Sequence, residues 1–207
     1  MISTVASAAR TLKLRARNSA GLPPLILVTD EARLPDPRPA IMALPRGSGV
    51  VFRHYTSPDR AKLAAALAAL CRRRRLLFIL GGNARLALEV RAGGLHLRER
   101  DLGFAIPPFA RRLLVTAAAH SRRSLVRAGR RGADAALVSP VFATKSHAGA
   151  SPLGVLRFAF LARQSPIPVY ALGGINAANA RRLAGSAAVG IAALGALSVV
   201  RGRRDPL

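Results

Sequence analysis

Two apolar runs that lead into polar loops constrain the fold most. The stretch from Ala136 to Gly154 begins with Ala, Leu and Val and continues into a segment rich in Ser, Thr, Gly and Pro, and the stretch from Pro168 to Ile175 ends near two adjacent glycines. Such runs are typical of buried parallel strands that end in polar loops. The amphipathic segment from Leu153 to Gln164 lies between them and is long enough for a crossover helix. The sequence therefore predicts a βαβ unit here.

The same unit recurs along the chain. Further apolar runs predict strands at 25–30, 49–55, 76–80, 94–97, 112–116 and 189–194, and helices are expected at 58–75, 83–91, 121–129 and 176–184. Four prolines between residues 31 and 48 argue against a full helix there. Eight strands at about 22 residues per unit predict an α/β protein, a compact (β/α)8 TIM barrel. A doubly wound sheet is the alternative, although no Gly-x-Gly-x-x-Gly follows the first strand.

Composition limits the domain organisation and the partners. We expect one barrel domain at 23–207, preceded by a basic, loosely ordered segment at 1–22 that contains no acidic residue. The net charge of +24 favours anionic partners, but the basic residues are spread along the chain and no nucleic-acid-binding motif is present. A nucleic-acid partner is therefore not expected.

The single cysteine, Cys71, excludes internal disulfides and metal sites built from several cysteines. The longest uncharged run is shorter than the roughly 20 apolar residues of a membrane helix. We expect a cytoplasmic protein without a membrane partner. No pattern in the sequence specifies an oligomeric state.

In a barrel of this kind, the residues that follow each strand form the site, and phosphate often binds to the loops after strands seven and eight. Gly173 and Gly174, together with the region of Gly195, are therefore candidates for a phosphate cradle. The candidates for acid–base chemistry and for charge are His120, Arg53, Asp101 and Lys145.

Several of these segments resemble the thiamine phosphate synthase/TenI family. The stretch Ser139-Pro-Val-Phe-Ala-Thr, followed by Ser-x-x-Gly-Ala-x-Pro-Leu-Gly154, looks like that family's sixth-strand loop. The other segments that match, in the expected order, are Leu25–Asp30, Gly94–Leu102, Ala119–Ser121 and Ala171–Ile175. The resemblance implies a (β/α)8 barrel that binds a thiazole phosphate. Synthase members join this thiazole to a pyrimidine diphosphate with Mg2+ and release pyrophosphate, whereas TenI members move a proton on the thiazole with a histidine.

The match is uneven across the site that the resemblance implies. For the thiazole half, Thr144, Ser146, Gly173, Gly174 and the region of Gly195 are kept. The diphosphate half departs from the family. Arg53 is kept after the second strand, but Tyr55 replaces a family lysine.

After the third strand, Gly81-Gly82-Asn83 stands in place of Asn-Asp-Arg, so one family metal carboxylate is absent at Gly82. The second carboxylate matches at Asp101, and a family lysine aligns with His147, with Lys145 two residues earlier as its candidate substitute.

Three functions remain open on these residues. The first is a divergent thiamine phosphate synthase that couples a thiazole phosphate to a pyrimidine diphosphate, with Asp101 holding Mg2+ and with Arg53 and Lys145 holding diphosphate. The second is a TenI-like tautomerase with His120 as general acid and base. The third is an inactive barrel that binds a phosphorylated ligand or an anionic polymer. Structural alternatives are a loop hydrogen bond for His120 and a helix cap for Asp101.

Overall fold

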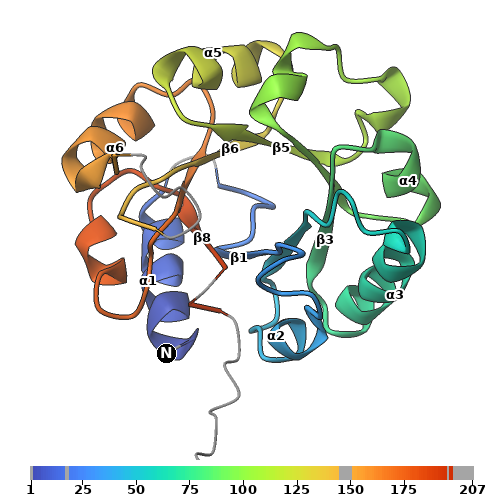
Figure 1. Ribbon diagram of the computed structural model, residues 1–207. Helices are drawn as coiled ribbons and strands as arrows, with labels where there is room; N and C mark the ends of the chain where they lie inside the picture. Colours follow the sequence, from blue (N-terminus) through green and yellow to red (C-terminus); the bar gives the residue numbers. More distant parts are fainter. Residues whose placement is uncertain (1, 17–18, 145–150, 195, 198–207) are drawn as a thin grey trace, which may run out of the picture.

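The computed structural model is a closed barrel of eight parallel strands that pair in chain order, with β8 closing on β1 (Figure 1). It describes residues 2–16, 19–144, 151–194 and 196–197. The strands are β1 (Leu25–Val28), β2 (Gly49–Phe52), β3 (Leu77–Gly81), β4 (Gly94–Leu97), β5 (Leu114–Ala119), β6 (Ala135–Val138), β7 (Val169–Leu172) and β8 (Gly190–Ala193). The predicted (β/α)8 barrel is therefore confirmed.

Each strand is buried on both faces, which explains why the strands read as continuous apolar runs. Ile26 and Val28 of β1 pack in one cluster with side chains of other strands, while Leu25 and Leu27 pack in a second cluster that includes the surrounding helices. Successive side chains of a strand point to opposite faces. The first cluster therefore fills the barrel and the second joins the barrel to its helices.

Helices surround the ring of strands (Figure 1). The α-helices are α1 (Ile2–Arg15), α2 (Arg38–Met42), α3 (Arg60–Arg73), α4 (Ala84–Glu89), α5 (Arg122–Arg130) and α6 (Gly154–Arg163), and the 3-10 helices are η1 (Glu99–Gly103), η2 (Pro108–Ala110) and η4 (Ala180–Leu183). The proline-rich segment at 31–48 holds only the short helix α2, in line with the prediction that it would not form a full helix.

The helix predicted at 176–184 is wrong in type and length, since only the four-residue η4 forms there. The side-chain oxygen of Asn176 accepts hydrogen bonds from the backbone N–H groups of Ala178 and Asn179, and the side chain of Asn179 accepts one from the backbone of Asn176. Such local bonds compete with the bonds of an α-helix.

The N-terminal segment also differs from the expected loose order, because α1 packs against β8, η4 and β1. Val5, Ala9 and Leu12 lie on one helical face and are buried. Burial of this face against the barrel stabilises a 14-residue helix, a length that is marginal for an isolated helix in water. The domain boundary at residue 22 stays a prediction.

Candidate active site

A cavity of about 420 Å³ lies at the carboxyl ends of the strands, where parallel strands deliver their loops to one face. Five of the predicted site residues line it together: Arg53, His120, Thr144, Gly173 and Gly174. Arg33, His96, Ser139 and Asn176 also line this cavity. Of the remaining predicted site residues, Lys145, Ser146, His147 and Gly195 lie outside the described part of the chain.

The basic side of the cavity comes from the loops after β1 and β2. The Arg53 Nε donates to the Thr29 carbonyl oxygen at 3.3 Å, and the Thr29 hydroxyl accepts from the Arg53 backbone N–H at 3.0 Å. One Asp30 carboxylate oxygen lies 3.7 Å from Arg53 and 3.4 Å from Arg33. Two guanidinium groups from different loops therefore share one carboxylate beside the cavity.

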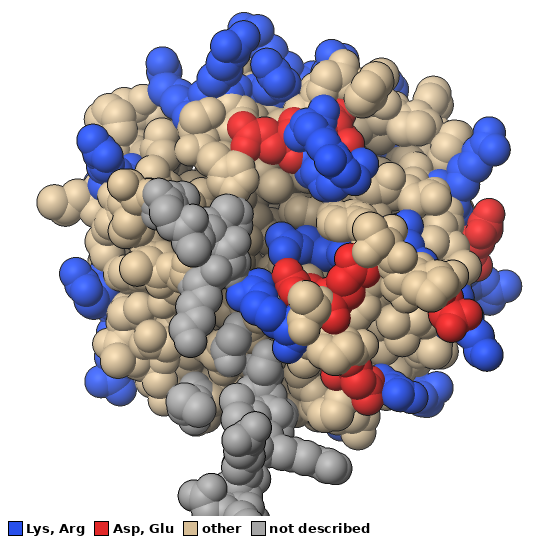
Figure 2. All heavy atoms as spheres, in the orientation of Figure 1, with Lys and Arg blue, Asp and Glu red and all other residues tan. Residues whose placement is uncertain are grey.

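Charge on this face of the molecule is distributed unevenly. In Figure 2, basic side chains alone stand along much of the outer edge, whereas acidic and basic side chains lie next to one another closer to the centre. The ion pairs of Asp30 and Asp101 belong to loops at the carboxyl ends of β1 and β4. Two of the nine acidic side chains of this very basic chain, Asp30 and Asp101, thus pair with arginines at the carboxyl ends of the strands.

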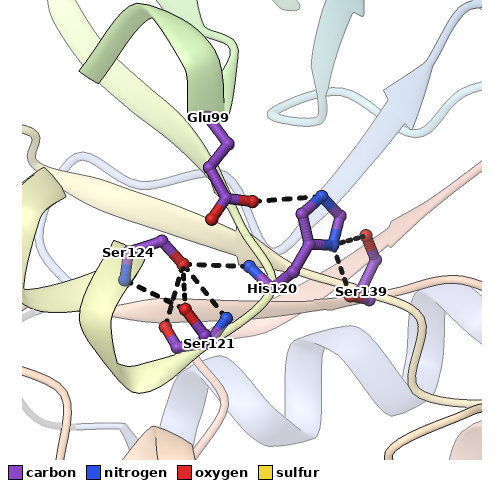
Figure 3. Close-up of polar contacts among 5 residues, drawn as sticks. All are labelled: Glu99, His120, Ser121, Ser124 and Ser139. Atoms are coloured by element: carbon purple, nitrogen blue, oxygen red, sulfur yellow. Dashed lines mark hydrogen bonds and ion pairs between the residues drawn. The ribbon is translucent and has the colours of Figure 1, made fainter. Parts of the chain in front are cut away.

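His120 lies between a carbonyl group and a carboxylate (Figure 3). Its Nδ1 is 2.6 Å from the Ser139 carbonyl oxygen, and its Nε2 is 3.5 Å from a Glu99 carboxylate oxygen. Because a carbonyl oxygen only accepts, Nδ1 carries the proton of this bond. The ring orientation is therefore fixed by the bond to Ser139, and Nε2 faces the acidic side chain.

The backbone at His120 is fixed by the start of α5. Ser121 caps this helix, since its hydroxyl accepts from the Ser124 backbone N–H at 3.2 Å, and the Ser124 hydroxyl accepts from the backbone N–H groups of His120 and Ser121 (Figure 3). A serine at this position satisfies N–H groups that a helix start leaves open. The local sequence His-Ser-x-x-Ser thus places the histidine at the strand end.

The glycine pair after β7 is required by the backbone itself. Gly173 and Gly174 have φ values of +94° and +66°, a region that favours glycine. A Cβ atom on Gly173 would lie 2.8 Å from the Pro140 Cα, and one on Gly174 would overlap the carbonyl oxygens of Phe142 and Ala143. The pair therefore lets the loops after β6 and β7 meet closely at one end of the cavity.

His96 of β4 lines the cavity but contributes no charge to it. Its Nδ1 is 2.9 Å from the Thr116 hydroxyl, and its side chain is buried. Burial lowers the pKa of His96 to about 3, with a further contribution from the charge of Arg53. The ring is therefore neutral at physiological pH and serves as a polar, uncharged surface.

Asp101, the predicted metal ligand, does not line the cavity. Its carboxylate accepts from the Arg98 Nε at 2.7 Å and from the Arg98 terminal nitrogen at 2.9 Å, and it caps the Arg98 backbone N–H at 3.2 Å. Burial alone would raise the pKa of Asp101, but these hydrogen bonds and the Arg98 charge outweigh it and lower the pKa. The helix-cap interpretation of Asp101 agrees with this geometry.

The described residues do not fit a Mg2+ site built by the protein. No three His, Cys, Asp or Glu side chains in the described ranges are placed to hold a metal ion together. Position 82 is a glycine, and both oxygens of Asp101 already bind Arg98. A bidentate pair with Arg is among the stronger hydrogen-bonded arrangements, so a cation would have to compete with Arg98 for this carboxylate.

Tyr55 occupies the place next to the two glycines after β3. Its ring lies under the Arg98 guanidinium, 5.1 Å from the ring centre, and under that of Arg60, at 5.6 Å. Its hydroxyl oxygen is buried and has no hydrogen-bond partner in the described structure. Burial raises the pKa of Tyr55, so the phenol stays neutral. The aromatic ring fills the space that the missing side chains at Gly81 and Gly82 leave.

Two residues near the cavity, Arg33 and Glu99, were not predicted as site residues from the sequence. Arg33 follows Asp30 by three residues, a spacing that allows an ion pair within one turn. Glu99 stands two residues before Asp101 in the same strand-end loop, and its approach to His120 joins two loops that are far apart in sequence. The short spacing between Asp30 and Arg33 weakly indicated the first contact, whereas no sequence pattern indicated the contact between Glu99 and His120.

Comparisons with known proteins agree with this architecture. A family described as thiamine monophosphate synthase (TMP-TENI) matches residues 25–197. A thiamine-phosphate synthase from Chlorobium luteolum is 36% identical over 191 residues, which are 87% of this chain and 88% of that protein. A thiamine-phosphate synthase from Thermosynechococcus vestitus is 31% identical over 152 residues, which are 72% of this chain and 43% of that protein. The chain likewise spans 49% and 39% of the thiamine-phosphate synthases from Prochlorococcus marinus and Synechocystis sp..

A solved structure gives the same result. The thiamine phosphate pyrophosphorylase from Pyrococcus furiosus superposes with a TM-score of 0.70 at 26% identity, over 86% of this chain and 88% of that one. The family match covers all eight strands of the barrel and the loops that line the cavity. The chain therefore belongs to the thiamine monophosphate synthase (TMP-TENI) family.

Proposed function

We propose that this protein is a thiamine-phosphate synthase, a transferase that couples a thiazole phosphate to a pyrimidine diphosphate and releases pyrophosphate. The observation that carries the proposal is the cavity itself, which has arginines from the β1 and β2 loops on one side and the Gly173-Gly174 pair on the other. Two anionic groups can thus be accommodated at separate positions. The synthase names of the relatives support the same reaction.

The glycine side is assigned to the thiazole phosphate. Without side chains, Gly173 and Gly174 leave backbone groups accessible to phosphate oxygens, and Thr144 adds a hydroxyl at the same end of the cavity. Ser146, His147 and Gly195 are assigned to this half on the family resemblance alone.

The arginine side is assigned to the diphosphate. The bond between the pyrimidine carbon and the diphosphate oxygen breaks, the thiazole takes its place on that carbon, and negative charge collects on the departing pyrophosphate. Arg53 holds that charge, with Lys145 as a second cation. Loss of one such donor in known enzymes costs roughly 100- to 1,000-fold in rate. The residues around Asp101 do not fit Mg2+, so the positive charge in this proposal comes from the side chains of the chain itself.

A tautomerase is the second candidate, and the setting of His120 favours it. The ring is held at Nδ1 by the Ser139 carbonyl oxygen, and Nε2 lies near the Glu99 carboxylate at the cavity. A histidine with one fixed nitrogen and one directed nitrogen is suited to move a proton on a bound substrate. In this reaction only the thiazole phosphate is needed.

A single-turnover assay tests the first proposal. Protein, thiazole phosphate and pyrimidine diphosphate are mixed in near-stoichiometric amounts with Mg2+ present, and thiamine phosphate is measured by fluorescence after oxidation. We expect product from the wild type, a loss of about 100-fold in Arg53→Gln, and full activity in Arg127→Gln, which removes the same charge from the exposed face of α5. Absence of product from the wild type would reject the synthase.

Deuterium exchange with solvent distinguishes the tautomerase from the synthase. Thiazole phosphate alone is incubated with the protein in D2O, and deuterium uptake at the ring carbon is followed by NMR. The tautomerase predicts uptake that His120→Gln abolishes and that Arg53→Gln leaves in place. No uptake with the wild type would reject this candidate, whatever the outcome of the coupling assay.

The proposed substrates are phosphorylated small molecules of primary metabolism, and we propose a cytoplasmic location on that basis. Among the described helices none is both long and apolar enough to cross a membrane.

A further inference from the structure

The two arginines beside the cavity form a defined arrangement. Arg33 comes from the loop after β1 and Arg53 from the end of β2, and both side chains line the cavity. Their guanidinium groups meet at one carboxylate oxygen of Asp30, at 3.4 Å and 3.7 Å. The Asp30 carboxylate also accepts from the Arg33 backbone N–H at 3.1 Å, which fixes it to its own loop.

The shared carboxylate explains how two cations can stand together at this position. Two guanidinium groups close to one another repel, and an anion between them offsets that repulsion. Burial would raise the pKa of Asp30, but hydrogen bonds and charge from Arg33, together with the charge of Arg53, lower it. Asp30 therefore stays ionised, and the three groups keep one net positive charge beside the cavity.

Among the described residues, no group of three His, Cys, Asp or Glu side chains is placed to bind a divalent cation beside these arginines. The nearest carboxylate expected for Mg2+, Asp101, is bound on both oxygens by Arg98, and Gly82 has no side chain. Tyr55 fills the volume beside Gly82, with ring atom Cε1 3.2 Å from the position of a Cβ at residue 82. The charge available to a bound polyphosphate in the described structure is thus that of the arginines.

We infer that this chain binds the diphosphate group through Arg33 and Arg53, positioned by Asp30, and that this binding does not require Mg2+. Arg33 is then a substrate-binding residue and Asp30 a positioning residue. The identity of the ligand rests on the proposed function. The inference about the arginines and the metal concerns binding alone and can fail or hold separately.

Isothermal titration calorimetry with inorganic pyrophosphate tests it. The full chain is titrated once with EDTA and once with excess MgCl2 at equal ionic strength. We expect one site per chain in EDTA, with a Kd within about threefold of the value in Mg2+. Arg33→Gln should weaken binding at least tenfold, in the range of one charge-assisted hydrogen bond. Arg33→Lys, which keeps the charge, should recover part of that loss.

A matched control variant distinguishes binding at Arg33 from the general attraction of pyrophosphate to a very basic protein. Arg127→Gln removes one exposed charge on α5, away from the cavity lining, and should change the Kd by less than about twofold. Circular dichroism and thermal unfolding of each variant establish that it is folded. An equal effect of Arg33→Gln and Arg127→Gln would overturn the assignment of Arg33.

Pyrophosphate binding that appears only with Mg2+ would overturn the inference about the metal. If thiamine phosphate is also formed only with Mg2+, the proposed function stands and this inference fails. If pyrophosphate binds in EDTA and no thiamine phosphate forms under any condition, the arginine site stands and the synthase fails.

Discussion

The Tyr55 hydroxyl oxygen lies 2.8 Å from the point where a Cβ atom at position 81 would stand. The Phe52 carbonyl oxygen is equally close to that point, so glycine is the residue that fits beside this tyrosine. In the family that the chain belongs to, the resemblance places a lysine at position 55 and an asparagine at position 81. The two departures are therefore coupled by packing, since the phenol occupies volume that a side chain at 81 would need.

Gly81→Ala should destabilise the protein by about 1–3 kcal/mol, the usual cost of extra volume in a packed region. In a Tyr55→Phe background the same change should cost less by at least about 0.5 kcal/mol, because the hydroxyl is one of the two closest atoms. Urea unfolding of the four proteins in this cycle gives the coupling. Gly103→Ala is the control, since nothing lies within 4 Å of a Cβ there, and purely additive costs would contradict the packing argument.

Gly174 after β7 can be compared with Gly154, a glycine of similar backbone geometry. Gly174 and Gly154 have φ values of +66° and +69°, but only a Cβ on Gly174 would overlap the carbonyl oxygens of Phe142 and Ala143. Alanine at 154 should cost about 1 kcal/mol from backbone strain, and alanine at 174 should cost at least about 2 kcal/mol more. Chemical denaturation measures both. Similar losses would mean that the loop after β6 relaxes freely.

The N-terminal helix α1 contains one buried and one exposed leucine, which allows a test of its packing. Leu12 is 4% exposed and Leu14 is 86% exposed. Leu12→Ala should lower the free energy of unfolding by about 2–3 kcal/mol through loss of buried contacts, while Leu14→Ala should change it by less than about 0.5 kcal/mol. Thermal and urea unfolding check this. Equal effects would support the loosely ordered segment expected from the sequence over a packed helix.

The Asp101–Arg98 pair predicts a dependence of stability on pH. Because the pKa of Asp101 is lowered in the folded state, its contribution is complete above the unfolded value of about 4 and is lost as the pH falls through the folded value. Asp101→Asn should be less stable than the wild type by about 0.5–1 kcal/mol at pH 7. The difference should shrink as the pH falls to about 3.

Urea unfolding across this pH series gives the measurement. Asp59→Asn is the matched loss of a carboxylate, at an exposed residue whose side chain makes no capping bond. A stability difference for Asp101→Asn that stays constant down to pH 3 would contradict the role of the ion pair.

Much of the barrel could be read from local patterns. The strand predicted at 94–97 forms with the same bounds, because a short apolar run after a glycine is buried on both faces in a parallel sheet. The N-terminal helix was not predicted, since its buried face is defined by contacts with β8, η4 and β1, which are distant in sequence. The helix expected at 176–184 failed because asparagine side chains bond to the local backbone.

The sequence by itself determined the order of strands and the glycines at their ends, because burial and positive φ act on a few neighbouring residues. It also marked Arg53, His120 and Gly173 as residues of one strand-end face. Only the tertiary structure decided which partners these residues meet. Glu99 meets His120 across two loops, and Asp101 pairs with Arg98 within one loop. Both contacts depend on side-chain positions, because charges act through space at distances that spacing along the chain does not fix.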